Sequence, residues 1–161
     1  MIRVYYRVIG SESMRVLIQR VAHASVAIEG KPCGSIKQGF LLLVGIKQGD
    51  SEETALKLAK KVAELRVFED AQGKMNLSLK EVNGAILSIS QFTLYADCRR
   101  GRRPGFEQAE KPQPAKRLYE FFNEQLTSYG IHVETGVFGA DMKVELCNDG
   151  PVTILLDSAE W

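Results

Sequence analysis

Two short segments of the sequence combine residue types that could act on a carbonyl group. Ser90-Gln91-Phe92-Thr93 places hydroxyl and amide side chains at the end of an apolar stretch. Asn148-Asp149-Gly150-Pro151-Val152-Thr153 joins polar residues to Gly and Pro, whose backbone angles suit a tight turn. A hydroxyl could attack an ester carbon, and positioned N–H groups could polarise its carbonyl. Taken singly, the first segment could equally be the polar end of a strand and the second a plain turn.

The more familiar hydrolytic and metal-binding patterns are missing from the sequence. No Gly-x-Ser-x-Gly or His-Glu-x-x-His is present, and neither His23 nor His132 neighbours a nucleophile in a recognisable elbow. The cysteines lack zinc-ligand spacing, and no glycine-rich phosphate loop occurs. We therefore expect both histidines to be structural or superficial, and we expect neither a metal nor a cofactor.

A basic segment is the third candidate for function. Arg99, Arg100, Arg102 and Arg103 crowd five positions. From residue 98 to residue 117 the sequence has seven basic and two acidic residues, a local excess of +5 in a chain whose net charge is +1. Such an excess suits the phosphates of a nucleic acid, whereas the balanced chain as a whole does not attract one. The alternative is a solvated loop with partial ion pairing.

The composition is that of one soluble domain. The 161 residues are 45% hydrophobic and 25% charged, which is ordinary for a globular protein. Three unclustered cysteines predict no disulfide framework, so we expect a reducing, cytoplasmic location. The longest apolar run, Phe40–Gly45, is too short to cross a membrane, and the N-terminus lacks the apolar core of a signal peptide.

Periodicity predicts a sheet-rich α/β domain with two main helices. The first helix begins at Asp50, with Asp50 and Glu53 as a capping pair, and the second opens at Pro112 or Pro114 and ends near Gly130. Their buried stripes contain Ala55, Leu58, Ala59, Val62 and Leu65 in the first, and Leu118, Tyr119, Phe122, Leu126 and Tyr129 in the second. The predicted strands span 15–21, 25–29, 40–46, 85–95, 131–135, 142–147 and 152–156. Helices do not separate these strands regularly enough for a doubly wound fold.

Residues 1–13 look separate from the rest, because residues 10–13 form a polar linker and Met14 reads like a fresh start. Alternation over residues 2–8 is compatible with a short extra strand. We favour an N-terminal extension without function and a single domain over residues 14–161.

The ordered set of segments resembles the D-aminoacyl-tRNA deacylase family from Met14 to Ser158. The resembling stretches are residues 19–21, 24–26, 65–68, 73–76, 90–97, 101–104, 135–136, 138–142 and 148–153. The resemblance implies a homodimer with active sites at its interface. It also implies a chiral proofreading reaction in translation, the hydrolysis of the ester that joins a D-amino acid to the 3′-terminal adenosine of tRNA. Glycine mischarged on alanine tRNA would be cleared as well.

The resemblance also assigns roles to residues. Gly150-Pro151 would be a Gly-cis-Pro pair that reaches into the other subunit's active site and excludes every L-amino acid by its backbone. Arg20 would hold the Gly-Pro carbonyl, with Asn148 and Thr153 in support; the alternative for Arg20 is a surface arginine on an edge strand. Arg99, Arg100, Arg102 and Arg103 would contact the tRNA.

The catalytic segment is interpreted as Ser90, Gln91, Phe92 and Thr93. Thr93 as a nucleophile would need a neighbouring base, and neither motif contains one. We favour backbone N–H groups of Phe92 and Thr93 that polarise the ester carbonyl, with the substrate's own 2′-hydroxyl assisting water. The rival interpretation is a nucleic-acid-binding module of the origin DNA-binding type that lacks catalysis.

Overall fold

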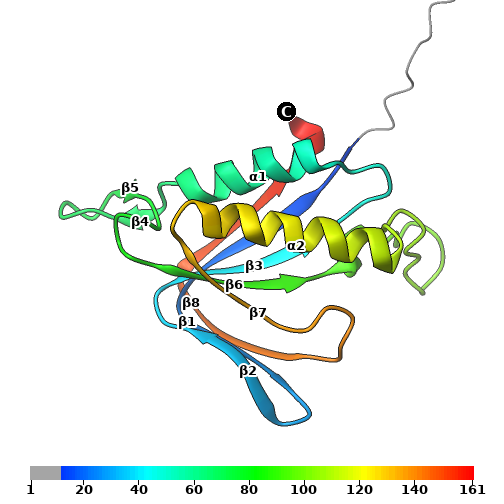
Figure 1. Ribbon diagram of the computed structural model, residues 1–161, viewed down its shortest axis with the longest axis horizontal. Coiled ribbons are helices and arrows are strands. Elements are labelled where there is room, and N and C mark those ends of the chain that lie inside the picture. Colours follow the sequence, from blue (N-terminus) through cyan, green and yellow to red (C-terminus); the bar gives the residue numbers. More distant parts are fainter. Residues whose placement is uncertain (1–11) are drawn as a thin grey trace, which may run out of the picture.

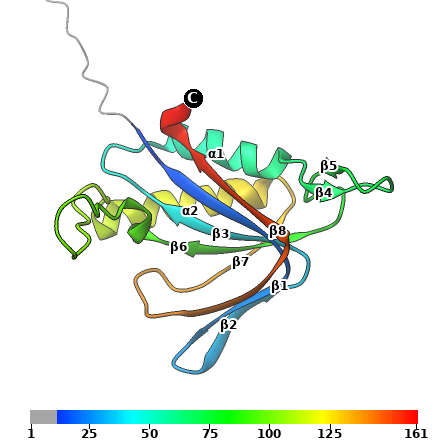
Figure 2. The same cartoon turned by 180° about the vertical axis from the view of Figure 1, so that it is seen from behind.

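The computed structural model describes residues 12–161, which form one curled sheet covered on one face by two helices (Figures 1 and 2). The sheet contains six strands in the order β2-β1-β3-β6-β7, with β8 paired to β1. Their bounds are β1 (Arg15–Ile28), β2 (Lys31–Ile36), β3 (Gly39–Gly45), β6 (Ala85–Ser90), β7 (His132–Thr135) and β8 (Lys143–Asp157). The strands β4 (Phe68–Glu69) and β5 (Met75–Leu77) form a separate hairpin. The sheet-rich α/β class with two main helices is confirmed.

Strand β1 organises the sheet, because it pairs antiparallel with three other strands. Its first half pairs with β3, its second half pairs with β2, and β8 follows it along nearly its whole length. The predicted break between residues 21 and 25 is therefore wrong, since one strand runs through both halves. The sheet curls until β2 approaches β7, where a side chain at Gly34 would begin 3.1 Å from the Thr135 carbonyl oxygen. Glycine allows this close approach.

Helices α1 (Glu52–Glu64) and α2 (Pro112–Ser128) lie side by side over the sheet (Figure 1). Their predicted stripes are buried, apart from Leu65 and Tyr129, which are half-buried. These stripes face a core shared with β1, β3 and β6, and a second, smaller core fills the curl of the sheet. The predicted capping pair is wrong: Ser51 caps α1 by accepting the Thr54 N–H, while Asp50 accepts N–H groups from Lys47 and Ser13.

Two strand predictions near the candidate segments are also corrected. The strand expected over residues 85–95 ends at Ser90, and residues 92–95 form a short 3₁₀ helix, η1 (Phe92–Tyr95). The strands expected at 142–147 and 152–156 are one strand, β8. The Asn148–Thr153 segment is therefore no connection between strands. It is an irregular stretch inside β8, where the register with β1 shifts around Val21.

Ser13, which we expected to belong to the N-terminal extension, packs against the domain. Ser13 is buried, its hydroxyl donates to Asp157 at 2.7 Å, and its N–H donates to Asp50 at 2.9 Å. A second short 3₁₀ helix, η2 (Ser158–Glu160), follows β8 and bonds to Met14. The strand considered over residues 2–8 lies outside the described residues.

Asp50 gives the protein a predictable pH dependence. Burial raises the pKa of its carboxyl from 3.8 to about 6, although the N–H groups of Lys47 and Ser13 act in the opposite direction. A carboxyl whose pKa is raised by folding stabilises the fold below its unfolded pKa, and this contribution is lost as the pH rises through the folded pKa. We expect the free energy of unfolding to fall between about pH 4 and pH 6.5 on this account.

Asp50→Asn should remove that part of the decline, because an amide does not ionise in this range. Urea unfolding of both proteins at pH 4.5 and pH 7.5 measures it, and any constant cost of the substitution cancels between the two pH values. An identical pH dependence in both proteins would refute this assignment.

Candidate active site

A largely apolar cavity of about 550 Å³ lies between the end of β6, the start of α2 and the chain before β8. Ser90, Gln91 and Phe92 form one wall, and Phe106, Tyr119 and Phe138 contribute aromatic side chains. This volume accommodates a nucleoside-sized ligand. Three members of the predicted catalytic segment therefore line the cavity, whereas Thr93 is not among its lining residues.

The surroundings of Thr93 do not equip it as a nucleophile. Its side chain is exposed, and its hydroxyl accepts a hydrogen bond from the Gln91 side-chain amide. An amide N–H is a donor and cannot take a proton from the hydroxyl. Activation of a threonine hydroxyl needs an adjacent base, so this geometry favours a role for the backbone over one for the hydroxyl.

The backbone N–H groups of η1 begin directly after the end of β6. Gln91 N–H still donates to the Val44 carbonyl at 2.8 Å, and the first bond of η1 runs from Leu94 N–H to the Gln91 carbonyl. The amides of Phe92 and Thr93 lie between these two bonds, at the start of η1, where N–H groups have no partner within the helix. Two adjacent N–H donors of this kind suit a carbonyl oxygen that gains negative charge.

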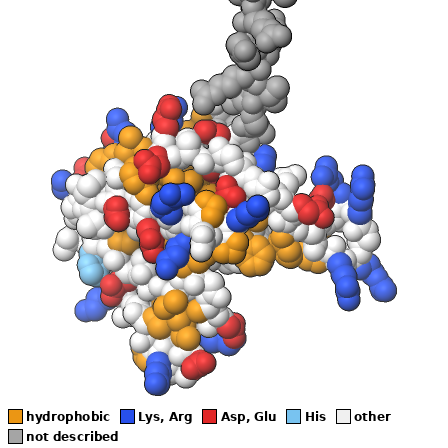
Figure 3. Space-filling view, turned by 45° about the vertical axis from the view of Figure 1, so that its right-hand side comes forward, with side chains coloured by type: hydrophobic (Ala, Val, Ile, Leu, Met, Phe, Trp, Pro, Cys, Tyr) orange, Lys and Arg blue, Asp and Glu red, His pale blue; other side chains and the backbone are white. Residues whose placement is uncertain are grey.

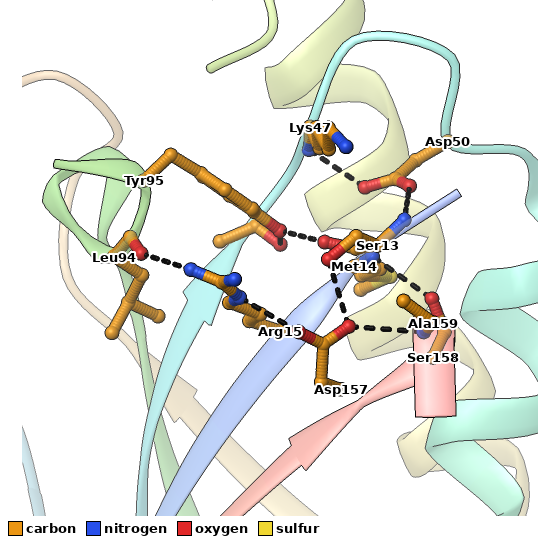
Figure 4. A network of polar contacts seen from close by, with 11 residues as sticks. Ser13, Met14, Arg15, Lys47, Asp50, Leu94, Tyr95, Asp157, Ser158 and Ala159 are labelled. Atoms are coloured by element: carbon orange, nitrogen blue, oxygen red, sulfur yellow. Dashed lines mark hydrogen bonds and ion pairs between the residues drawn. The ribbon is translucent and has the colours of Figure 1, made fainter. Parts of the chain in front are cut away.

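A network of polar contacts holds η1 against β1 and the end of β8 (Figure 4). The Arg15 guanidinium donates to the Leu94 carbonyl at 2.7 Å and to Asp157 at 2.9 Å, and it lies over the Tyr95 ring. The Tyr95 hydroxyl lies 2.9 Å from the Gly45 carbonyl oxygen and also contacts the Ser13 carbonyl. These contacts fix the position of the short helix that carries the Phe92 and Thr93 amides.

Asp157 is the acidic centre of this network. Burial raises the pKa of its carboxyl, but the Ala159 N–H, Arg15 and Ser13 outweigh burial, and the net pKa is lowered. The carboxylate is therefore ionised at neutral pH and pairs with Arg15. Sequence reasoning missed Arg15, Tyr95 and Asp157, because they lie far apart in the chain and no local pattern connects them.

The second candidate segment is a turn that its own asparagine closes. The Asn148 side chain accepts the Val152 N–H at 2.8 Å and donates to the Val152 carbonyl at 3.2 Å and the Thr153 hydroxyl at 3.1 Å. The Gly150-Pro151 peptide bond is cis, and both residues are exposed. Gly150 has a φ of 143°, and a side chain there would begin 2.9 Å from the Val152 nitrogen. Glycine is therefore required at this position.

Arg20 holds the other side of the turn. It is 5% exposed, its Nε donates to the Asp149 carbonyl at 2.9 Å, and its Nη1 donates to the Val67 carbonyl at 2.6 Å. The alternative of a surface arginine on an edge strand is thus wrong, because β1 has strands on both sides. The carbonyl that Arg20 binds is the one that precedes Gly150, one residue earlier than the Gly-Pro carbonyl we expected.

The two segments do not meet within one chain. Neither Gly150 nor Pro151 lines the cavity formed by Ser90, Gln91 and Phe92. Any joint action of the turn and the cavity requires a second copy of the chain.

The part of the basic segment between Asp97 and Gly105 forms an arm that projects from one end of the molecule (Figure 3). Asp97 and Gly105 close its base with two backbone hydrogen bonds of 2.7 and 2.9 Å. Arg99 donates twice to the Asp97 carboxylate, and these side-chain hydrogen bonds lower the pKa of Asp97 to about 2. Arg100, Arg102 and Arg103 are exposed, and no hydrogen bond or ion pair holds them within residues 12–161. Arg99 therefore braces the arm, and the other three arginines face solvent.

Other potential chemistry is sparse in the described part of the chain. Within residues 12–161, no three His, Cys, Asp or Glu side chains are grouped so that they could hold a metal ion. His23 and His132 are exposed, and His132 lies 3.6 Å from Glu134. No helix of these residues has the length and apolar character that crossing a membrane demands.

Comparison of the sequence with known families gives one match over most of the chain. Residues 17–157 match the family described as D-Tyr-tRNA(Tyr) deacylase. A protein of Halalkalibacterium halodurans named D-aminoacyl-tRNA deacylase is 59% identical over 145 residues, which are 90% of this chain and 99% of that protein. A protein of Thermus aquaticus with the same name is 58% identical over 147 residues, which are 91% of this chain and 97% of that protein.

Two solved structures have a similar fold. One, named c-Myc DNA Unwinding Element Binding Protein, is 37% identical with a TM-score of 0.82, and the match covers 88% of this chain and 97% of that one. The other is described as a probable eukaryotic D-amino acid tRNA deacylase. It is 17% identical with a TM-score of 0.78, covering 90% of this chain and 99% of that one, and this likeness concerns the fold alone.

Proposed function

We propose that this chain, a hydrolase that belongs to the D-Tyr-tRNA(Tyr) deacylase family, removes D-amino acids from tRNA. The bond that it cleaves is the ester between the D-amino acid and the 3′-terminal adenosine. The observation that carries the proposal is the nucleoside-sized cavity walled by Ser90, Gln91 and Phe92, beside two backbone N–H groups without helical partners. The products are a free D-amino acid and reusable tRNA. This substrate belongs to translation, which is a cytoplasmic process.

The chemistry needs little from side chains. The Phe92 and Thr93 N–H groups donate to the ester carbonyl oxygen as it gains negative charge. A water molecule, assisted by the neighbouring 2′-hydroxyl of the adenosine, forms the new bond to the carbonyl carbon. The bond from that carbon to the 3′-oxygen breaks, and the 3′-oxygen receives a proton. This route is supported by the exposed Thr93 hydroxyl, whose partner is the donor amide of Gln91.

Selection by handedness is assigned to the Gly150-Pro151 turn of a second copy of the chain. A turn held by Arg20 and Asn148 is a rigid wall, whose carbonyl oxygens accept hydrogen bonds from the substrate ammonium. The wall leaves no room for a side chain in the L position, while a D side chain points away from it. Glycine, which has no side chain to exclude, should be accepted, including glycine mischarged on alanine tRNA. Exclusion by backbone is independent of side-chain identity.

The second copy would pack on the open face of β1 and β8. On this face Leu17 lies opposite Leu155, which is half exposed, and Gln19 lies opposite Thr153, next to the turn. An apolar patch continuous with the turn suits a homodimer in which each turn reaches the partner's cavity. Sedimentation analysis tests this: a protein that is active as a monomer would contradict the dimer.

The arm is assigned to the phosphates of the tRNA acceptor stem. Each arginine that neutralises a phosphate steepens the decline of affinity with salt, by about 0.9 in a plot of log affinity against log salt for double-stranded nucleic acid. Replacing Arg100, Arg102 and Arg103 together with Ala should weaken tRNA binding and flatten this slope by roughly 2 to 3. Filter binding of tRNA from 50 to 300 mM salt measures both effects.

Arg99→Ala is the matched control for the arm, because Arg99 is engaged with Asp97. It should leave the slope within about one of the native value. A triple variant with the native slope would remove the arm from tRNA binding.

A DNA-binding module without catalysis is the rival function, and one structure of similar fold is named for binding a DNA element. It is not favoured, because relatives that are 58–59% identical over nearly their whole length are named as deacylases. Release of D-tyrosine from D-Tyr-tRNA, with L-Tyr-tRNA as the control, separates the two functions. Release of D-tyrosine alone is expected. Tight binding of DNA without release of either amino acid would favour the rival.

A further inference from the structure

An aromatic pair, formed by the exposed Phe92 and the half-buried Phe106, lines the cavity. Phe92 is 58% exposed, which is high for a large apolar side chain. Its ring meets Phe106 edge to face, with the centroids 5.0 Å apart and the planes at 73°. Phe106 therefore fixes the orientation of the Phe92 ring and leaves much of that ring uncovered.

The pair joins the cavity to the arm. Both phenylalanines line the cavity, and Phe106 directly follows Gly105, which closes the base of the arm against Asp97. Figure 3 shows hydrophobic side chains that extend toward the root of the arm, and Lys and Arg side chains at its end. The two phenylalanines thus lie where a ligand would extend from the cavity toward Arg100, Arg102 and Arg103.

The neighbouring charges indicate what covers this ring. An apolar segment of a second copy could bury Phe92, but it would gain nothing from the three solvent-facing arginines nearby. A single-stranded RNA end offers both a flat base for the ring and phosphates for the arginines. Bases stack on exposed aromatic rings with little sequence preference, and each such contact contributes about 1–3 kcal/mol.

We infer that Phe92, braced by Phe106, is a stacking platform for the base of the nucleotide that precedes the terminal adenosine of the substrate. The inference rests on the proposed function, since it requires an aminoacyl-RNA whose terminal nucleoside fills the cavity. The platform holds the penultimate base between the cavity and the arm. It acts on substrate binding, separately from the backbone N–H groups that act on the ester.

The test removes the base and the ring separately. A minihelix RNA charged with D-tyrosine is prepared with its natural penultimate nucleotide or with an abasic ribose at that position. Loss of the base should lower kcat/KM of the native protein by roughly 5- to 160-fold, mainly through KM, as expected for the loss of one base–aromatic contact. In Phe92→Leu, removal of the base should change kcat/KM less than about twofold, whereas in Phe92→Tyr, which keeps an aromatic ring, removal of the base should lower kcat/KM about as much as in the native protein.

The outcomes distinguish this inference from the proposed function. If removal of the base lowers kcat/KM by the same factor in the native protein and in Phe92→Leu, the platform is excluded. If Phe92→Leu instead dissociates the protein in sedimentation analysis and base removal costs the same in both proteins, Phe92 belongs to a subunit interface, and the inference is overturned. If the native protein does not hydrolyse the natural minihelix at all, the proposed function itself has failed.

Discussion

A D-Tyr-tRNA whose terminal adenosine lacks the 2′-hydroxyl is expected to be hydrolysed at least about 100-fold more slowly than the natural substrate, the scale of one lost proton-transfer group. Thr93→Ala, in contrast, should retain activity within about tenfold, because it loses one exposed hydrogen bond with Gln91. The reason is the same in both cases. In the proposed route the protein supplies the Phe92 and Thr93 N–H groups, and the substrate supplies the group that assists water.

Single-turnover rates of both substrates with both proteins measure these effects. Ester bonds to a 2′-deoxy nucleoside also differ in uncatalysed stability, so each rate is divided by the rate without enzyme. A Thr93→Ala protein that is folded but inactive, together with normal cleavage of the deoxy substrate by the native protein, would identify Thr93 as the nucleophile.

Arg20→Met is expected to damage both stability and selection. Arg20 is buried, and its loss leaves the Asp149 and Val67 carbonyls without their donor, at a cost of roughly 1–3 kcal/mol each. Release of the Asp149 carbonyl also frees the turn that contains Gly150 and Pro151. The rate ratio for D- over L-tyrosyl ester should therefore fall by at least about tenfold, the equivalent of 1.4 kcal/mol.

Arg66→Met is the matched control for Arg20→Met. Arg66 also binds a backbone carbonyl, that of Asn76 at 2.7 Å, but it is exposed and has no hydrogen bond to the turn in the described part of the chain. It should change the free energy of unfolding by less than about 1 kcal/mol and leave the D-to-L ratio intact. An unchanged ratio in Arg20→Met, measured where that protein is fully folded, would separate Arg20 from selection.

Local sequence patterns predicted the helices and strands whose burial depends on the spacing of nearby apolar residues. The apolar steps through Leu58 and Val62, and through Leu118 and Phe122, identified both helices, because these side chains face one buried core. The apolar run from Phe40 identified β3, which has partners on both sides. The helix ends were less predictable. Asp50 and Ser51 are both residue types that cap helices, and Asp50 is instead engaged by Lys47 and by the distant Ser13.

Long-range contacts explain what the sequence could not predict. The end of β6 at Ser90 depends on η1, whose Leu94 carbonyl and Tyr95 hydroxyl are held by Arg15 and the Gly45 carbonyl from distant parts of the chain. The continuity of β8 through Pro151 depends on β1, whose register shifts accommodate the turn. No local sequence pattern predicts either feature.

The segments that form the candidate site could be predicted from the sequence, but the separate roles of their residues could not. Composition alone drew attention to the segment from Ser90 and to the four clustered arginines. It did not distinguish Arg99, which braces the arm through Asp97, from Arg102, which faces solvent. The roles of Phe92, Thr93 and Gly150 in the reaction stay predictions, because they concern a substrate and a second copy of the chain.

Exclusion of the L side chain by a rigid backbone is the central claim, and three esters on one tRNA test it most directly. The rates of release of glycine, D-alanine and L-alanine by the native protein are compared with the rates without enzyme. Hydrolysis of the glycyl and D-alanyl esters, with the L-alanyl ester no faster than without enzyme, is the predicted result. Hydrolysis of the L-alanyl ester as fast as the D-alanyl ester, or of none of the three, would contradict the claim.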